Sequence, residues 1–287
     1  MEPPLPNPRE TEDGRLKIYF LPNLLTAANL FCGFVALTMI VSVREIEAGN
    51  LDQIREAIGF IILACIFDLF DGRVARMGGR ESPFGREFDS LADLISFGVA
   101  PAFLVHRVVL RDVFESRPEI GWFIASIYLI CGAFRLARFN CLAAAAGGGG
   151  GKEFLGFPIP SAAGLVSSLT WMLMWFYDNG RDFAQSWWKW LLPALMLFLS
   201  WMMVSEVKYP TFKSLDLRAT RTFTKTLVAI LFIGLVIITR GRIVFFFLSV
   251  FFTGYLIYGF IRPRISRKMR REIEDESDEE EDDFPAS

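Results

Sequence analysis

Long apolar runs recur along most of this chain, and they restrict what it can fold into. A helix needs about 20 predominantly apolar residues to cross the hydrocarbon core of a bilayer. The chain is 53% hydrophobic and has a mean hydropathy of +0.37. Runs that reach or approach the required length cover about 22–43, 56–77, 86–106, 121–142, 158–177, 188–205, 225–239 and 243–261. We therefore predict an all-α fold, a polytopic transmembrane helical bundle of about eight spans.

Opposite charges are segregated along the sequence, so the net charge of −2 says little about the membrane part. Ten acidic residues and no basic residue lie in 272–283, directly after a basic run in 262–271. Of the 30 Lys and Arg residues, 21 lie in segments on the same side as the N-terminus. Because cytoplasmic segments carry an excess of positive charge, both termini are expected on the cytoplasmic side of the cell (inner) membrane.

Three regions follow from this pattern. Residues 1–20 are a cytoplasmic N-terminal segment, 21–261 a single membrane domain, and 262–287 a cytoplasmic tail that is first basic and then acidic. The basic run is expected to anchor the topology and to contact anionic lipid. The acidic run is expected to be disordered. This organisation indicates the lipid bilayer as a partner, and no feature of it indicates nucleic acid.

Four aspartates interrupt the second and third apolar runs, near their predicted cytoplasmic ends. Their pattern is D-x2-D-G-x2-A-R-x8-G-x3-D-x3-D, formed by Asp68, Asp71, Gly72, Ala75, Arg76, Gly85, Asp89 and Asp93. Residues three or four apart share a helix face, so each run presents one pair of carboxylates. Glycine and proline residues between the runs predict a short turn, and two antiparallel helices would bring the pairs face to face. The two motif glycines leave space there for a ligand or a second helix.

Carboxylates at membrane depth are costly unless they pair, face a water-filled cavity or bind a cation. Oxygen ligands at this density suit Mg²⁺, Mn²⁺ or Ca²⁺ rather than zinc or copper. Two such ions can clamp a diphosphate and stabilise its leaving oxygen, and Arg76 can contact the same phosphates. The pattern therefore favours metal-assisted phosphoryl transfer. Three alternatives remain open: a buried Asp–Arg network without substrate, a divalent-cation transporter, and a lipid-binding scaffold without activity.

The aspartate pattern resembles the signature of the CDP-alcohol phosphotransferases, integral membrane enzymes that join an alcohol to a phosphatidyl or related group from a CDP-linked donor. The resemblance implies a six-helix catalytic core, a homodimer, and a pair of Mg²⁺ or Mn²⁺ ions as cofactor. It also implies that Asp68, Asp71 and Asp89 are metal ligands. Asp93 would be both a ligand and the base that takes the proton of the attacking alcohol.

The same resemblance implies a binding site for CDP-diacylglycerol. Gly72 and Arg76 would contact the CDP moiety, and Ser82 lies where the family has a small hydroxyl residue. Segment 22–26 resembles the stretch that precedes the family motif and adds two residues in donor-contacting positions. The complete predicted donor set is Asn23, Thr26, Gly72, Ala75, Arg76, Ser82 and Gly85.

Flanking segments carry information about the acceptor. Those at 22–33, 89–102, 134–140, 156–160, 203–205 and 209–213 resemble bacterial and archaeal family members that transfer the phosphatidyl group to L-serine. This implies formation of phosphatidylserine and CMP, with Arg135, Arg138 and Asn140 as candidate serine contacts. The arginines can instead be interfacial anchors that snorkel. Glycerol 3-phosphate and inositol phosphate remain alternative acceptors.

Overall fold

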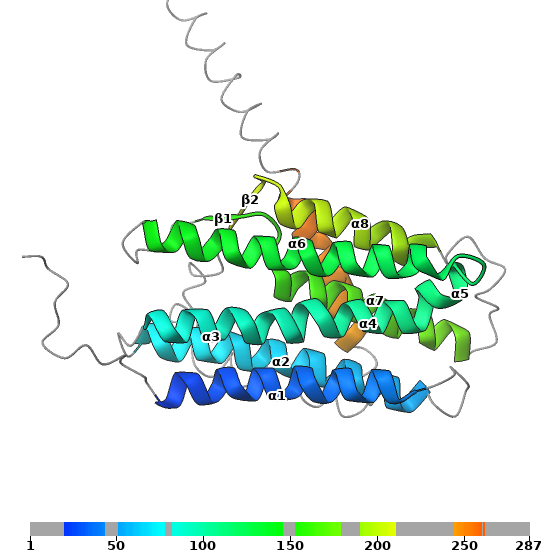
Figure 1. The fold of residues 1–287 in the computed structure, drawn as a ribbon, viewed down its shortest axis with the longest axis horizontal. Coiled ribbons are helices and arrows are strands. Elements are labelled where there is room, and N and C mark those ends of the chain that lie inside the picture. The colour runs from blue at the N-terminus through cyan, green and yellow to red at the C-terminus, as the bar shows by residue number, and fades with distance from the viewer. Residues whose placement is uncertain are drawn as a thin grey trace, which may run out of the picture.

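The computed structural model describes residues 20–43, 51–77, 82–145, 153–178, 190–210, 244–259 and 261. Within these ranges the helices are α1 (Phe20–Ser42), α2 (Leu51–Met77), α3 (Pro83–Asp93), η2 (Leu94–Val99), α4 (Ala100–Val105), η3 (His106–Leu110), α5 (Arg111–Val113), α6 (Pro118–Ala145), α7 (Ile159–Asp178), α8 (Leu191–Val204) and an unlabelled helix, Val244–Gly259. Two short strands, β1 (Glu153–Leu155) and β2 (Lys208–Pro210), accompany them. The chain is a bundle in which α1, α2, α6, α7, α8 and the segment that starts with α3 run along one common direction, while the C-terminal helix Val244–Gly259 crosses them (Figure 1).

The predicted helical membrane protein is confirmed at the level of its long helices. Four helical segments are long and apolar enough to cross a membrane: Phe20–Ser42, Pro83–Val113, Pro118–Ala145 and Ile159–Phe176. The predicted run 225–239 lies outside the described residues, as do the N-terminal segment before residue 20 and the charged tail. The count of eight spans therefore stays a prediction. The all-α prediction is confirmed for the described residues, which also contain one short antiparallel β1–β2 pair with Phe154 opposite Tyr209.

The third apolar run, predicted over 86–106, forms a longer helical segment that extends from Pro83 to Val113, and its start is set by capping. Elements α3 to α5 follow one another without a break from Pro83 to Val113, and η2 and η3 are wider, π-type turns. Ser82 precedes the first turn, and its Oγ accepts the Gly85 N–H at 3.0 Å. Pro83 follows at a position where a helix has no use for a backbone N–H.

Helix α1 packs along α2 and along the segment that contains α3, η2 and α4. Gly33 permits the second of these contacts. A Cβ atom at Gly33 would lie 2.7 Å from the Ser96 Cα atom, so any side chain there would push the two helices apart. The small residue thus fixes how closely α1 approaches η2, as is common at helix crossings in membranes.

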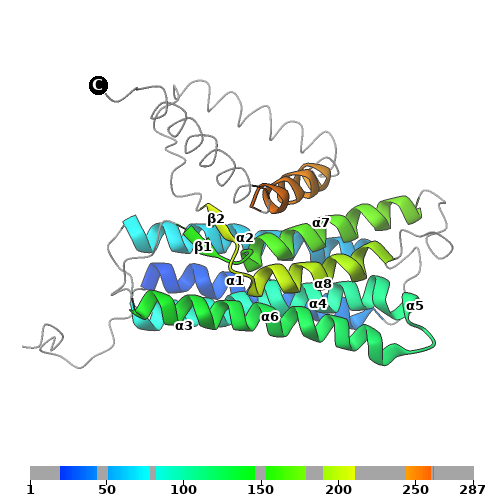
Figure 2. The same cartoon turned by 90° about the horizontal axis from the view of Figure 1, so that it is seen from above.

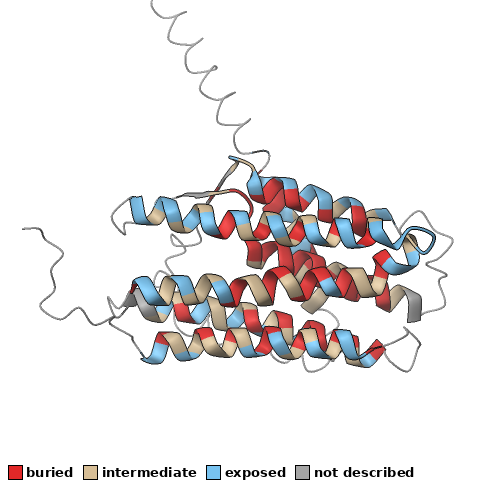
Figure 3. Cartoon of the chain, viewed as in Figure 1, coloured by how far each residue is buried: buried red, intermediate tan, exposed pale blue. Residues whose placement is uncertain are grey.

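Many large apolar residues are exposed. They include Phe31 and Phe34 on α1, and Trp122, Phe123 and Phe134 on α6. Figure 3 colours the exposed positions along the helices pale blue. Aliphatic residues and buried aromatic side chains such as Phe97, Tyr128 and Phe157 fill the interior between the helices. An apolar exterior on helices of this length fits contact with lipid, so the structure is that of an integral membrane protein.

The guanidinium of Arg138 joins α6 to the C-terminal ends of α8 and β1. It donates to the main-chain oxygens of Val204 at 2.8 Å, Ser205 at 3.0 Å and Leu155 at 3.3 Å. The last carbonyls of a helix have no partner within that helix, so an arginine in this place satisfies them. Next to it, Gly156 has a φ of 78°, and its N–H donates to the Val207 oxygen at 2.9 Å.

The helix Val244–Gly259 lies against α7 and Tyr209 (Figure 2). Phe252 packs directly over Gly164 of α7, and the rings of Trp171 and Phe245 stack with their centroids 4.7 Å apart. The Tyr209 hydroxyl donates to the Leu256 oxygen at 3.4 Å. The C-terminal helix is therefore part of the same packed body as the aspartate-bearing helices.

Replacing Gly156 with alanine is expected to lower the free energy of unfolding by roughly 2 kcal/mol or more. A Cβ atom there would lie 3.1 Å from the Met203 carbonyl carbon and 3.0 Å from Arg138 Nη2, at a positive φ. Thermal unfolding in lipid nanodiscs measures the effect. Gly59→Ala is the control, because nothing lies within 4 Å of a Cβ atom at that helical position. Equal melting temperatures for the two variants would contradict this account.

Candidate functional site

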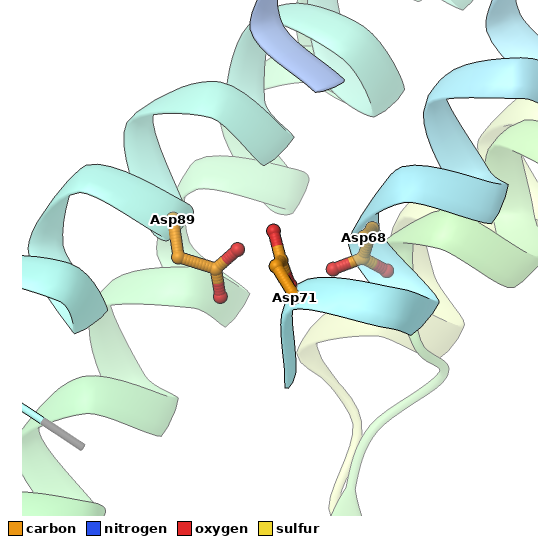
Figure 4. A group of neighbouring side chains, drawn as sticks. All are labelled: Asp68, Asp71 and Asp89. Carbon is orange, nitrogen blue, oxygen red and sulfur yellow. The ribbon is translucent and has the colours of Figure 1, made fainter. Parts of the chain in front are cut away.

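Three of the four predicted aspartates lie together at one end of the bundle. Asp68 and Asp71 come from the last turns of α2, and Asp89 faces them from α3 (Figure 4). One carboxylate oxygen of each lies within 4.8 Å of the others. At this end of the bundle α1 and α3 begin, and α2 and α6 end (Figure 1).

The donor set and its environment fit a hard divalent cation. All three groups offer carboxylate oxygens, which suit ions such as Mg²⁺ or Mn²⁺. Asp71 is 4% exposed, and Asp89 Oδ1 is buried with no hydrogen-bond partner among the described residues. Negative groups this close repel one another, and a bound cation relieves that repulsion. These three residues can therefore hold a metal ion.

A hydroxyl on α1 orients one of these carboxylates. Thr26 Oγ1 lies 2.9 Å from Asp71 Oδ2 and 3.1 Å from the Pro22 main-chain oxygen. Thr26 is buried, so its single hydroxyl proton is shared between these two acceptors. The predicted donor-site residue Thr26 thus contacts the aspartate group directly.

Asp93 lies one helical turn beyond Asp89 and outside the group of three. Its side chain is 6% exposed, and its Oδ1 accepts a hydrogen bond from Asn29 Nδ2 at 3.1 Å. The structure therefore separates the four aspartates into three that converge and one that is held by α1. A metal-ligand role for Asp93 stays a prediction.

Positive charge reaches the aspartates from α6. Arg135 is 7% exposed and interacts electrostatically with Asp93 and Asp68. Its guanidinium carbon lies 5.9 Å from the centroid of the Phe139 ring. The sequence also predicted a cation from Arg76, at the end of α2, but the side chains of Ala75 and Arg76 lie outside the described part of the chain.

The other two predicted serine contacts have different surroundings. Arg138 donates to the carbonyl oxygens at the ends of α8 and β1, as described above. Asn140 Nδ2 donates to Ser90 Oγ at 2.9 Å and to Glu87 Oε2 at 3.4 Å, which joins α6 to α3. Asn140 Oδ1 is buried, and no described residue donates a hydrogen bond to it. Of the three, Arg135 is the residue that interacts with the aspartates in the described part of the chain.

Three predicted donor contacts meet at the start of α3. A Cβ atom at Gly85 would lie 3.2 Å from Ser82 Oγ and 3.3 Å from Asn23 Oδ1, so these residues are close neighbours. Asn23 Nδ2 is buried and finds no acceptor within the described ranges. Ser82 Oγ accepts the Gly85 N–H and keeps its own proton for donation. Gly72 is half-buried on α2, directly after Asp71.

Two residues of this region were not singled out from the sequence. Asn29 binds Asp93, and its signal would have been a polar residue in an apolar run, three positions after Thr26. Tyr255, from the C-terminal helix, interacts electrostatically with Arg135. Nothing in the sequence near Tyr255 indicates that contact, because it depends on how a distant helix packs.

Comparison with known proteins gives a consistent result. The profile of the CDP-alcohol phosphatidyltransferase family matches residues 19–205. The chain is 34% identical over 245 residues to a CDP-diacylglycerol–serine O-phosphatidyltransferase of Helicobacter pylori, covering 85% of this chain and 91% of that protein. It is 33% identical over 194 residues to the enzyme of that name from Bacillus subtilis, covering 68% and 92%. An archaetidylserine synthase of Methanothermobacter thermautotrophicus is 34% identical over 192 residues, covering 66% and 69%.

Asp89→Asn is expected to weaken Mn²⁺ binding about tenfold or more, because a neutral amide replaces one of three converging carboxylates. Titration of the protein in nanodiscs without substrate, followed by electron paramagnetic resonance of free Mn²⁺, measures the affinity. Asp52→Asn is the matched control, since Asp52 is exposed near the other end of α2 and pairs with Arg55 at 2.6 Å. Unchanged affinity in the Asp89 variant would show that this group is not the metal site.

Proposed function

The chain belongs to the CDP-alcohol phosphatidyltransferase family, and from this premise we propose that it transfers the phosphatidyl group of CDP-diacylglycerol to L-serine. The products are phosphatidylserine and CMP. The observation that carries the proposal is the group of three converging aspartates with a fourth aspartate and a buried arginine beside it. Relatives named for serine transfer, aligned over most of the chain, support serine as the acceptor.

Asp68, Asp71 and Asp89 would hold the divalent cations, with Asp93 as a further ligand. Mg²⁺ or Mn²⁺, as a pair, would neutralise the diphosphate of the donor and polarise the phosphorus under attack. Thr26 keeps the Asp71 carboxylate turned toward this group through its 2.9 Å hydrogen bond. The protein's own contribution is thus a set of oriented oxygen ligands at the end of the bundle.

The start of α3 would bind the cytidine and phosphate groups of the donor. Asn23 Nδ2 and the Ser82 hydroxyl proton are donors next to the aspartates, and Gly85 leaves the backbone open to a ligand. Gly72, Ala75 and Arg76 at the end of α2 would complete this surface. Backbone without side chains allows the close approach that a diphosphate requires.

Asp93 would act as the general base. The serine hydroxyl gives its proton to Asp93, and the hydroxyl oxygen forms a bond to the β-phosphorus of CDP-diacylglycerol, which carries the diacylglycerol group. The bond from that phosphorus to the oxygen of the CMP leaving group breaks, and CMP departs with the electron pair. A carboxylate within hydrogen-bond reach of the hydroxyl is the geometry that such a proton transfer needs.

Arg135 would bind the serine carboxylate. It is buried beside Asp93, so a serine whose hydroxyl contacts Asp93 can place its carboxylate on the guanidinium. Asn140 would assist from the next turn of α6. Arg138, by contrast, would act through the scaffold, because its donors bind main-chain oxygens.

The remaining features of the proposal concern the setting of the enzyme. The site would open to the cytoplasm from the cell (inner) membrane, with both termini on that side and about eight spans between them. The catalytic unit would be the membrane domain 21–261, assembled as a homodimer. Charge distribution and family membership support this arrangement.

With CDP-diacylglycerol and Mg²⁺ or Mn²⁺, L-serine is expected to release CMP from the purified protein, whereas glycerol 3-phosphate and inositol phosphate release little. A phosphomonoester carries close to two negative charges and calls for a denser basic pocket than one buried arginine supplies. Chromatography of CMP and of the lipid product measures turnover. Release that persists in excess chelator would exclude the metal mechanism. Robust release with glycerol 3-phosphate and none with serine would keep the family and overturn the acceptor.

Arg135→Lys is expected to raise the KM for serine about tenfold, which corresponds to about 1.4 kcal/mol, while the KM for CDP-diacylglycerol changes little. Lysine keeps the charge but loses the two-pronged geometry that matches a carboxylate. Arg138→Lys is the matched control three residues later on α6, expected to lower the melting temperature with the serine KM nearly unchanged. A larger serine effect at Arg138 would reverse the assignment of the two arginines.

A further inference from the structure

Helix α1 carries two hydrogen-bond donors one turn apart, and each contacts an aspartate from a different helix. Thr26 donates to Asp71 of α2, and Asn29 donates to Asp93 at the end of α3. Asp71 belongs to the group of three carboxylates, and Asp93 does not. Helix α1 therefore contacts one aspartate inside the group of three through a hydroxyl, and one aspartate outside it through an amide.

Asn29 fixes the orientation of the Asp93 carboxylate. Its side chain is 0% exposed, and Nδ2 lies 3.1 Å from Asp93 Oδ1. An amide NH₂ group can only donate, so this contact occupies lone-pair density of one carboxylate oxygen and leaves the other oxygen for a different partner. The contact also sets the rotation of the carboxylate, which a general base needs in order to meet a hydroxyl at a defined angle.

The position of Asn29 is itself fixed by the adjoining helix. Ser96 Oγ donates to the Asn29 main-chain oxygen at 3.0 Å. Gly33, one turn further along α1, lets the Ser96 backbone approach, since a Cβ atom there would lie 2.7 Å from Ser96 Cα. Ser96 follows Asp93 by three residues, within the π-type turn η2. The segment that carries Asp93 is thus joined to α1 at two neighbouring points.

The carbonyl oxygen of the Asn29 side chain, Oδ1, is buried, and no described residue donates a hydrogen bond to it. An asparagine that serves packing alone would be expected to satisfy both ends of its amide, because an unmet buried acceptor is costly. Here the satisfied end is the one that contacts Asp93.

We infer that Asn29 is a positioning residue for the general base: it holds Asp93 through one oxygen, and it leaves the two lone pairs of the other oxygen for the acceptor hydroxyl and for the metal that Asp93 would also ligate. This inference rests on the proposed function, because it takes Asp93 as the base. It assigns Asn29 an effect on the rate of the chemical step. It assigns Thr26, three residues earlier, an effect on the metal-binding group instead.

Asn29→Leu tests this inference, because leucine has the same number and branching of heavy side-chain atoms, suits a membrane helix and removes the donor. We expect kcat to fall roughly 10- to 100-fold, while the KM values for both substrates and the Mn²⁺ concentration for half-maximal activity change less than about threefold. Asn29→Gln keeps an amide donor and is expected to recover part of the rate. Steady-state CMP release in nanodiscs provides all four quantities.

Thr26→Val is the contrast on the same helix, expected to raise the Mn²⁺ requirement more than it lowers kcat at saturating metal. Ser96→Ala is a milder second variant, which removes the hydrogen bond to the Asn29 main-chain oxygen. It is expected to lower kcat several-fold with little change in the KM values or the Mn²⁺ requirement. It tests the inference if Asn29→Leu does not fold. Thermal unfolding and CDP-diacylglycerol binding verify that each variant is intact.

A kcat within about threefold of wild type in folded Asn29→Leu would overturn the inference. So would a rise in metal requirement that matches the kcat loss, because the residue would then act on the metal group. Failure of the proposed function shows separately, as a wild-type protein that prefers another acceptor. The Asn29 comparison is then made with that acceptor.

Discussion

Repulsion between carboxylates is the constraint on which the rest of this structure depends. Oxygens of Asp68, Asp71 and Asp89 lie within 4.8 Å of one another in a bundle whose exterior is apolar. At an effective dielectric constant of about 20, each such pair of charges costs roughly 3 to 4 kcal/mol. A protein of ordinary stability cannot leave several such pairs without compensation. Donors from α1, a guanidinium from α6 and a bound cation are the available forms of compensation.

The compensating groups come from helices that must be held in place by contacts far from the aspartates. Arg135 reaches them because α6 is fixed to the ends of α8 and β1 through Arg138. Gly156 and the β1–β2 pair complete that junction, and the C-terminal helix packs over Tyr209 beside it. These contacts lie outside the aspartate group and stabilise the bundle that carries it.

Two arginines on one helix show why position in the fold, rather than residue type, assigns a role. Arg135 and Arg138 are three residues apart and share one side of α6, so their sequence context is nearly the same. One is buried among carboxylates, whereas the other donates to carbonyl oxygens at helix and strand ends. The difference arises because Asp93 and Asp68 interact with the first arginine, whereas the ends of α8 and β1 lie beside the second. An equivalent division separates Thr26 from Asn29 on α1.

The sequence by itself determined the apolar helices and the convergence of Asp68, Asp71 and Asp89. The helices follow from hydropathy, and the shared face of Asp68 and Asp71 follows from helical periodicity, which acts over a few residues. It did not determine the contact of Asn29 with Asp93, the hydrogen bond from Arg138 to the end of α8, or the interaction of Tyr255 with Arg135. Those contacts join residues that are dozens of positions apart. Only the tertiary structure decides them, because the crossing of α1 over η2 at Gly33 and the rotation of α6 result from side-chain packing across helices.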